Sequence, residues 1–191
     1  YINLFPIYAN AATQLGTNYE NYVNRYMQTI NTKSVSFDYY GLRNGVEIGS
    51  DIYTNLDLIR SKTLAAKKPF WVITQAGADN VSNPGDTPKN KQPNEVEQRW
   101  TVWANLALGS KGIAYFCYWT PSVYPNTYFM IDHSGNQTDN YRYIKQINED
   151  IYTIGKKLLY CHADGAIMTN TRYYPLYENS GAGRSKYGPI Q

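Results

Sequence analysis

Two polar side chains stand near the ends of strand-like runs, where they could exchange a proton or bind a hydroxyl group. Asp38 lies among aromatic residues in the run Ser-Phe-Asp-Tyr-Tyr-Gly at 36–41. Such surroundings disfavour a charged carboxylate and raise its pKa, as a general acid requires. Gln75 ends the run at 69–75, and its amide can hold a hydroxyl or orient water but cannot be a carboxylate nucleophile. The structural alternatives are a turn-capping Asp38 and a buried Gln75 amide.

The chain is rich in tyrosine, with 20 Tyr and four Trp against only five Phe. Tyrosine and tryptophan combine a flat apolar face with a polar edge, which suits a sugar ring that stacks and hydrogen-bonds at once. Tyr8, Tyr40, Tyr118 and Trp119 all stand at the ends of strand-like runs. We expect them, with Gln75, to bind a carbohydrate, and Trp119 to form a floor for the ring because the Thr-Pro after it ends the strand. Aromatic core residues are the alternative.

Hydrolysis of a glycosidic bond normally needs two carboxyl groups, about 5–5.5 Å apart for retention and about 6.5–9.5 Å apart for inversion. Asp38 is the acid that we predict to be catalytic. Glu95 and Glu97 begin a helical stretch, where acids complement the helix dipole. His133 and His162 have no second ligand at metal spacing. No G-x-S-x-G, G-x-G-x-x-G or P-loop motif occurs, so we expect neither a metal nor a cofactor.

Four strand-like runs alternate with four helical stretches. Strands are expected at 2–8, 34–40, 69–75 and 112–119, and helices at 19–31, 51–67, 94–108 and 139–159. Successive units of this size with short apolar strands indicate a parallel sheet, in either a doubly wound fold or a (β/α)8 barrel. Polar and aromatic strand ends, without a phosphate-binding turn, favour the barrel. The expected fold is therefore α/β, the C-terminal half of a TIM barrel, about strands five to eight.

Helical periodicity predicts which side of each helix faces the core. The inward residues should be Tyr19, Tyr22, Val23, Tyr26, Met27 and Ile30 in the first helix, Ile52, Leu56, Ile59 and Leu64 in the second, Val96, Trp100, Trp103 and Ala107 in the third, and Tyr143, Ile144, Ile147, Ile151, Ile154 and Leu158 in the fourth.

The pattern changes after the last helix. Residues 1–160 form the expected half-barrel, whereas residues 161–191 hold short β-prone pieces and Gly-rich turns, which indicate the beginning of an appended β-rich domain. The N-terminal half of the barrel and the rest of the β-rich domain are expected elsewhere in the same protein.

Composition excludes several classes of partner. A net charge of +3 without a basic cluster argues against a nucleic-acid partner. No apolar run approaches the ~18 residues of a membrane helix, so no membrane span is expected. Cys117 and Cys161 make neither a disulfide framework nor a metal-binding pair. The many Asn, Tyr and Thr residues and the few Lys favour a secreted, periplasmic or cell-surface protein.

The run at 99–119, from Arg-Trp-Thr-Val-Trp to Tyr-Phe-Cys-Tyr-Trp, resembles the last helix-and-strand unit of family 42 β-galactosidases and related clan A glycoside hydrolases. Residues 69–76 look like the preceding strand, and the likeness covers about residues 2 to 160. It implies a glycoside hydrolase with a nucleophilic Glu ending the seventh strand, where this chain has Thr74 and Gln75. The acid/base Glu of those enzymes lies on the fourth strand, outside this segment. Residues 36–41 are also similar to the sixth-strand motif of chitinase-like family 18 enzymes, whose Asp positions an N-acetyl nucleophile.

Three functions fit these observations. The first is a glycoside hydrolase acting on oligo- or polysaccharide at the C-terminal face of the barrel. The second is a carbohydrate-binding barrel that has lost its nucleophilic Glu and does not cleave its ligand. The third is a structural barrel within a larger surface protein.

Overall fold

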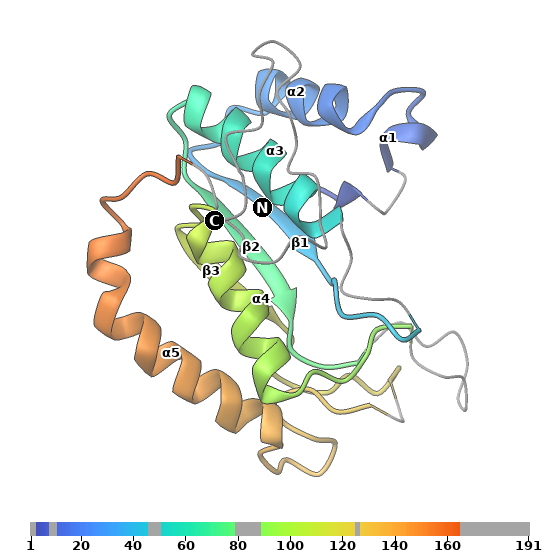
Figure 1. Ribbon diagram of the computed structural model, residues 1–191. Coiled ribbons are helices and arrows are strands. Elements are labelled where there is room, and N and C mark those ends of the chain that lie inside the picture. Colours follow the sequence, from blue (N-terminus) through green and yellow to red (C-terminus); the bar gives the residue numbers. More distant parts are fainter. Residues whose placement is uncertain (1–2, 8–10, 46–50, 79–88, 125–126, 165–191) are drawn as a thin grey trace.

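The fold is known from a computed structural model that describes residues 3–7, 11–45, 51–78, 89–124 and 127–164 (Figure 1). Three strands form one parallel sheet in the order β1-β2-β3, namely β1 (Val35–Tyr39), β2 (Phe70–Gln75) and β3 (Gly112–Phe116). The helices are α1 (Ala11–Gln14), α2 (Tyr19–Thr29), α3 (Asp51–Ala65), α4 (Glu95–Ala107) and α5 (Asp139–Leu158). The predicted alternation of helices with parallel strands is confirmed.

The first predicted strand, at 2–8, is reduced to a short edge segment in its described residues, 3–7. Leu4 forms a single parallel bridge with Phe37. The N–H of Leu4 donates to the Ser36 carbonyl at 2.8 Å, and the Asp38 N–H donates to the Leu4 carbonyl at 3.4 Å. The edge segment thus lies beside β1, and the spatial order of the strands follows the order in the chain.

The helices between the strands gather on one face of the sheet. Figure 1 shows α2, α3 and α4 on the same side of the sheet, with α5 next to α4. Consecutive parallel strands joined by right-handed crossovers add in one direction, which brings their helices to the same face. This face carries the main core, whose buried members include Leu4, Tyr19, Val23, Tyr26, Val35, Phe37, Tyr39, Ile52, Leu56, Ile59, Phe70 and Val72.

The opposite face of the sheet carries the alternate residues of each strand. Asp38 is in register with Ile73 of β2, and Ile73 is in register with Ala114 of β3. Near the amino ends of the strands, a Cβ added to Gly112 would lie 2.4 Å from the Trp71 ring, so the indole packs directly on the glycine. Trp71 is nonetheless 46% exposed, because no helix of the described residues covers this face.

The predicted inward side of three helices is largely confirmed. Tyr19, Val23 and Tyr26 of α2 are buried, as are Ile144 and Ile147 of α5. In α3, the predicted Ile52, Leu56 and Ile59 are fully buried, but Leu64 near the helix end is 42% exposed.

The predicted buried stripe of α4 is only partly right, since Trp100 packs against the core and Trp103 is partly buried, but Val96 and Ala107 face outward. Val96 is 75% exposed and Ala107 is exposed, whereas the residues that the helix buries are Gln98, Thr101, Val102 and Asn105. Polar residues are tolerated there because their side chains find backbone partners. The Gln98 amide donates to the Gln75 carbonyl at 3.0 Å, and the Asn105 amide donates to the Thr101 carbonyl at 2.7 Å.

The last predicted strand, at 112–119, ends earlier than expected, at Phe116. The predicted β-rich domain at 161–191 lies outside the described residues from 165 onward. Cys117 and Cys161 are not joined by a disulfide. Within the described segments, no helix is long and apolar enough to cross a membrane.

Candidate functional site

The carboxyl ends of the three strands meet at one edge of the sheet, here called the carboxyl edge, where β1 continues into Tyr40, β2 ends at Gln75 and β3 ends at Phe116. In parallel α/β sheets this edge is where ligands bind, because the loops after the strands converge there. The candidate site is therefore built from the residues around it.

Two loops pair with each other at the carboxyl edge. Arg43, after β1, and Asn90, before α4, form an antiparallel bridge. The Lys91 N–H donates to the Leu42 carbonyl at 2.7 Å, and the Asn44 N–H donates to the Lys89 carbonyl at 3.0 Å. We call this pair of segments, 42–44 and 89–91, the loop ribbon.

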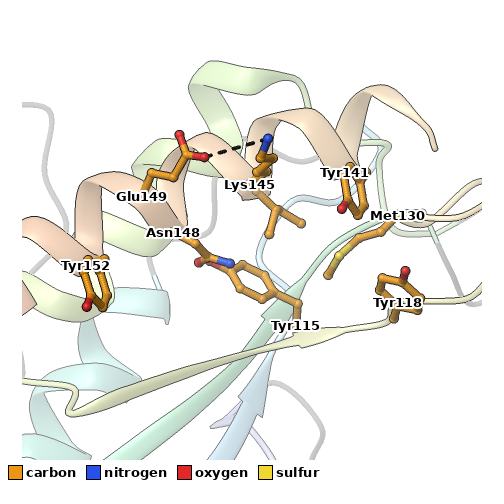
Figure 2. A pocket seen from close by; sticks show the side chains of 9 residues that line it. Tyr115, Tyr118, Met130, Tyr141, Lys145, Asn148, Glu149 and Tyr152 are labelled. Carbon is orange, nitrogen blue, oxygen red and sulfur yellow. Dashed lines mark hydrogen bonds and ion pairs between the residues drawn. The ribbon is translucent and has the colours of Figure 1, made fainter.

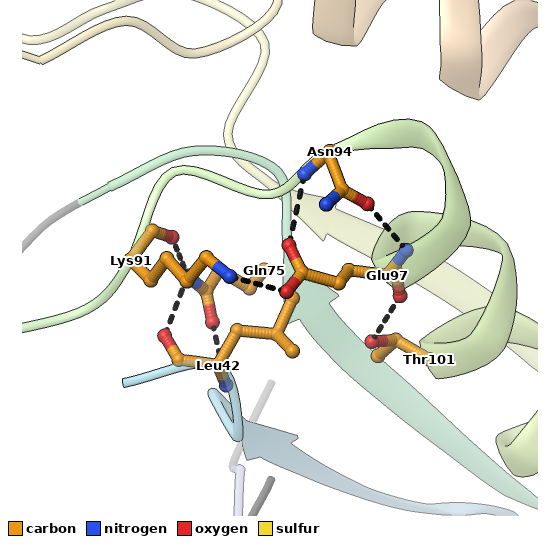
Figure 3. A network of polar contacts seen from close by, with 6 residues as sticks. All are labelled: Leu42, Gln75, Lys91, Asn94, Glu97 and Thr101. Carbon is orange, nitrogen blue, oxygen red and sulfur yellow. Dashed lines mark hydrogen bonds and ion pairs between the residues drawn. The ribbon is translucent and has the colours of Figure 1, made fainter. Parts of the chain in front are cut away.

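Gln75 holds the loop ribbon to the end of β2 (Figure 3). Its amide nitrogen donates to the Leu42 carbonyl at 3.1 Å and to the Lys91 carbonyl at 2.5 Å. Its amide oxygen accepts the Leu42 N–H at 3.2 Å, and the side chain is only 2% exposed. Both donors and one acceptor of this amide are therefore used within the protein.

Glu95 and Glu97, the two acids in the first turn of α4, stabilise the start of the helix, as predicted. Asn94 and Glu97 form a reciprocal capping box, in which the Glu97 carboxylate accepts the Asn94 N–H at 3.1 Å. The other carboxylate oxygen of Glu97 forms an ion pair with Lys91 (Figure 3). Both oxygens are occupied, so Glu97 is not available as an acid catalyst in this arrangement.

A row of aromatic rings crosses the carboxyl edge. The Tyr40 ring lies 5.8 Å from the Phe116 ring, centre to centre, although the two residues come from β1 and β3. Phe116 meets Phe129 edge to face at 5.7 Å, and Phe129 lies 5.8 Å from Tyr124. Of these residues, sequence reasoning singled out only Tyr40. The alternation of side chains along a strand could have identified Phe116, because Phe116 is in register with Gln75 and therefore points to the same face of the sheet.

The segment after β3 folds back on itself beside this row. The Thr120 hydroxyl donates to the Ile131 carbonyl at 2.6 Å and accepts the Phe129 N–H at 3.0 Å. Trp119 pairs with Ile131 through its backbone, and its side chain is 51% exposed at the surface.

Gly77 permits the close approach of this segment to the end of β2. A Cβ at position 77 would lie 2.6 Å from the Tyr128 carbonyl oxygen and 2.8 Å from the Phe129 ring. The absence of a side chain is therefore required for the aromatic row to reach the edge.

Asp38 lies on the helix-free face of the sheet, two residues before Tyr40. Its Oδ1 accepts a hydrogen bond of 2.7 Å from the side-chain amide of Asn3, on the neighbouring edge segment. Burial raises the pKa of the Asp38 carboxyl above its ordinary value of 3.8. The pKa shift thus has the predicted direction, but the flanking Phe37 and Tyr39 belong to the core on the opposite face of the sheet, and the partner Asn3 was not anticipated.

Tyr118 lies in a different place from the other candidates. It helps to line a pocket of about 540 Å³ between β3 and α5 (Figure 2). At the base of this pocket the Tyr115 hydroxyl donates to Asn148 at 2.8 Å, and burial raises the pKa of Tyr115. The pocket is lined by Tyr115, Tyr118, Met130, Tyr141, Ile144, Lys145, Asn148, Glu149 and Tyr152.

The structure therefore brings Tyr40 and Gln75 together at the carboxyl edge, with Asp38 on the adjoining face, while Tyr118 lines the separate pocket. Tyr8 lies outside the described residues. In the parts of the chain that the structure covers, no three His, Cys, Asp or Glu side chains are grouped to hold a metal ion.

The chain is similar in sequence to one known family of enzymes. A family model for the family 42 glycoside hydrolases, described as beta-galactosidase, matches residues 3–154. No curated protein matches the chain.

Proposed function

Because the chain belongs to the family 42 glycoside hydrolases, we propose that it forms one half of a (β/α)8 barrel, about strands five to eight, whose carboxyl edge binds a saccharide for hydrolysis. The observation that carries the proposal is the convergence at one strand-end edge of a polar amide, a row of aromatic rings and, on the adjoining face, a carboxyl group. This combination suits a ligand that has both an apolar ring face and many hydroxyl groups.

The order of the strands supports a barrel over a doubly wound sheet. A doubly wound sheet reverses its strand order and has helices on both faces. Here the order is sequential, and the helices between the strands share one face.

The outer edge of β3 also supports the barrel. In the described segments β3 pairs with β2 alone, and its other edge borders two hollows toward α5, of about 540 and 300 Å³. A closed barrel needs another strand at this position, and the hollows leave room for one.

Asp38 is the proposed catalytic acid. A raised pKa keeps a carboxyl group protonated closer to neutral pH, as proton donation to a leaving group requires. Hydrolysis needs a second carboxyl group, and Glu97 is committed to its helix cap and to Lys91. We therefore propose that the second carboxyl group comes from outside the described residues.

A binding barrel without hydrolysis is the second candidate. One observation favours it: Thr74 and Gln75, where the resemblance implies the nucleophilic Glu, hold no carboxylate, and both are buried. In this version Tyr40 and Trp119 stack on a glycan that is held but not cut.

One experiment distinguishes the two candidates. Cleavage of lactose, whose sugar leaving group must be protonated as it departs, and calorimetric binding of methyl β-galactoside are measured for the full chain, for Asp38→Asn and for the exposed control Asp139→Asn. Cleavage that Asp38→Asn abolishes while binding survives supports the hydrolase, provided that Asp139→Asn behaves as the unaltered chain. Binding without cleavage selects the second candidate. Neither binding nor cleavage of galactosides refutes both.

A further inference from the structure

Asn3 and Asp38 form an incompletely satisfied polar pair on the helix-free face. The Asn3 amide nitrogen donates to Asp38 Oδ1 at 2.7 Å, which fixes the orientation of the amide group. Its oxygen, Oδ1, is then a buried acceptor with no partner in the described ranges. A buried acceptor without a donor is unfavourable, so a ligand that supplies one gains affinity at this point.

The carboxyl group of Asp38 supplies the other acceptor, because Oδ1 accepts the Asn3 amide and still has a second lone pair when the other oxygen carries the proton of the proposed catalytic acid. Across the sheet its neighbour in register is Ile73, followed by Ala114, and neither side chain can donate a hydrogen bond. The pair therefore presents two acceptor oxygens, one from each residue, in surroundings poor in donors.

Aromatic rings lie within reach of these two acceptors. Residues two apart on one strand are about 6.5 Å apart along it and share a face, so Tyr40 follows Asp38 on the same face. The Tyr40 ring contacts the Phe116 ring at 5.8 Å. A pyranose that stacks on this pair would extend its ring hydroxyls toward Asp38 and Asn3.

We propose that Asn3 and Asp38 together select a sugar by accepting hydrogen bonds from two adjacent ring hydroxyls, so that Asn3 is a specificity-determining residue. The inference rests on the proposed saccharide site. Phosphate and carboxylate ligands are disfavoured, since they would bring further acceptors and negative charge to a site that needs donors. The unpaired Asn3 oxygen distinguishes this arrangement from a lone acid at a strand end.

The test is calorimetric binding of methyl β-D-galactopyranoside and its four monodeoxy analogues to the full chain. Removal of either of two adjacent hydroxyls should weaken binding about ten-fold or more, the size of one lost hydrogen bond to a polar or charged acceptor, while removal of the others has little effect. In Asn3→Ala, binding should become insensitive to one of these two deletions. In Asp38→Ala, it should become insensitive to the other.

Controls separate binding from folding. The exposed Asn21→Ala should keep the unaltered deoxy profile, and a melting curve for each variant shows whether it is folded. If Asn3→Ala does not fold, the more conservative Asn3→Ser should also lose the response to one deletion.

The binding results distinguish the proposed role of Asn3 from the proposed saccharide site. An unaltered chain that binds the galactoside but responds equally to all four deletions, or an Asn3→Ala profile identical to the parent, overturns the role of Asn3 and leaves the saccharide site standing. Tighter binding of methyl β-galactosaminide than of the galactoside would assign the pair to an amine and overturn the two-hydroxyl proposal. No binding of any glycoside refutes the proposed function itself.

Discussion

Replacing Gln75 by glutamate tests what the end of β2 does. The family resemblance aligns Thr74 and Gln75 with the nucleophile, and Gln75→Glu would introduce a carboxylate there without changing the side-chain length. The structure gives this amide another task, because its nitrogen donates to the carbonyls of Leu42 and Lys91 and so holds the loop ribbon. We expect the variant to lose stability and not to gain hydrolysis.

The size of the loss follows from the individual contacts. The Leu42 carbonyl keeps a second donor, the Lys91 N–H at 2.7 Å, so its loss is small. The Lys91 carbonyl loses the 2.5 Å donor and faces an oxygen instead. One unsatisfied carbonyl costs about 1–3 kcal/mol, and the buried carboxylate adds to it, for a total of about 2–5 kcal/mol. For a chain of this size that lowers Tm by about 4–20 °C.

Thermal unfolding at two pH values measures the effect. The carboxyl group that Gln75→Glu introduces can donate to the Lys91 carbonyl once it is protonated, so the loss should be smaller at pH 4 than at pH 7. Gln137→Glu, at an exposed residue, controls for the added charge and should leave Tm nearly unchanged. A Gln75→Glu variant that keeps the parent Tm would refute the structural role of this amide, and one that gains cleavage of p-nitrophenyl β-galactoside would refute the expectation that a carboxylate here is not catalytic.

Three further changes have defined outcomes. Trp119→Ala should weaken binding of a galacto-oligosaccharide by about 1–3 kcal/mol in calorimetry. Tyr160→Ala, at an exposed residue, is the control. Unchanged affinity of Trp119→Ala would show that Trp119 does not contact the ligand. Gly77→Ala should cost about 1–3 kcal/mol of unfolding free energy through overpacking against Tyr128 and Phe129; a denaturant titration that matches the parent would contradict this close contact. Because the folded pKa of Asp38 is raised, its ionisation destabilises the fold as pH rises from 3.8 through that higher pKa. Asp38→Asn should therefore stabilise the protein more at pH 7 than at pH 3.5, and an equal effect at both pH values would show that burial does not act on this carboxyl.

The sequence was most informative where apolar periodicity and burial coincide. The apolar side of α2 and the alternating residues of β1 and β2 became the core, because helices on one face of a parallel sheet must bury that stripe. The parallel sheet itself also followed from the lengths of the successive units. A pattern that is carried by many residues tolerates individual exceptions such as Leu64.

Periodicity failed where polar side chains do the packing. In α4 the buried positions include Gln98, Thr101 and Asn105, whose amides and hydroxyl bond to backbone carbonyls. A rule that searches for apolar residues misses these buried polar positions, although it correctly identified Trp100 as packed against the core. The end of β3 was misplaced for a related reason, since Cys117 to Trp119 are apolar or aromatic but leave the ladder with β2.

The candidate site was only partly predictable because its contacts join distant segments. Strand ends nominated Asp38, Tyr40 and Gln75, since parallel strands bring their carboxyl ends together. The partners of these residues depend on how loops fold back, which local sequence does not encode. Asn3 and Phe129 reach the site through such long-range contacts.

The loop ribbon constrains how this protein can be redesigned. Segments 42–44 and 89–91 are hydrogen-bonded to each other and to Gln75, so they behave as one mechanical unit anchored to β2. A graft that transfers one of the two loops from a related enzyme would break a shared register. Chimeras should therefore exchange both loops together and keep the glutamine as the common anchor.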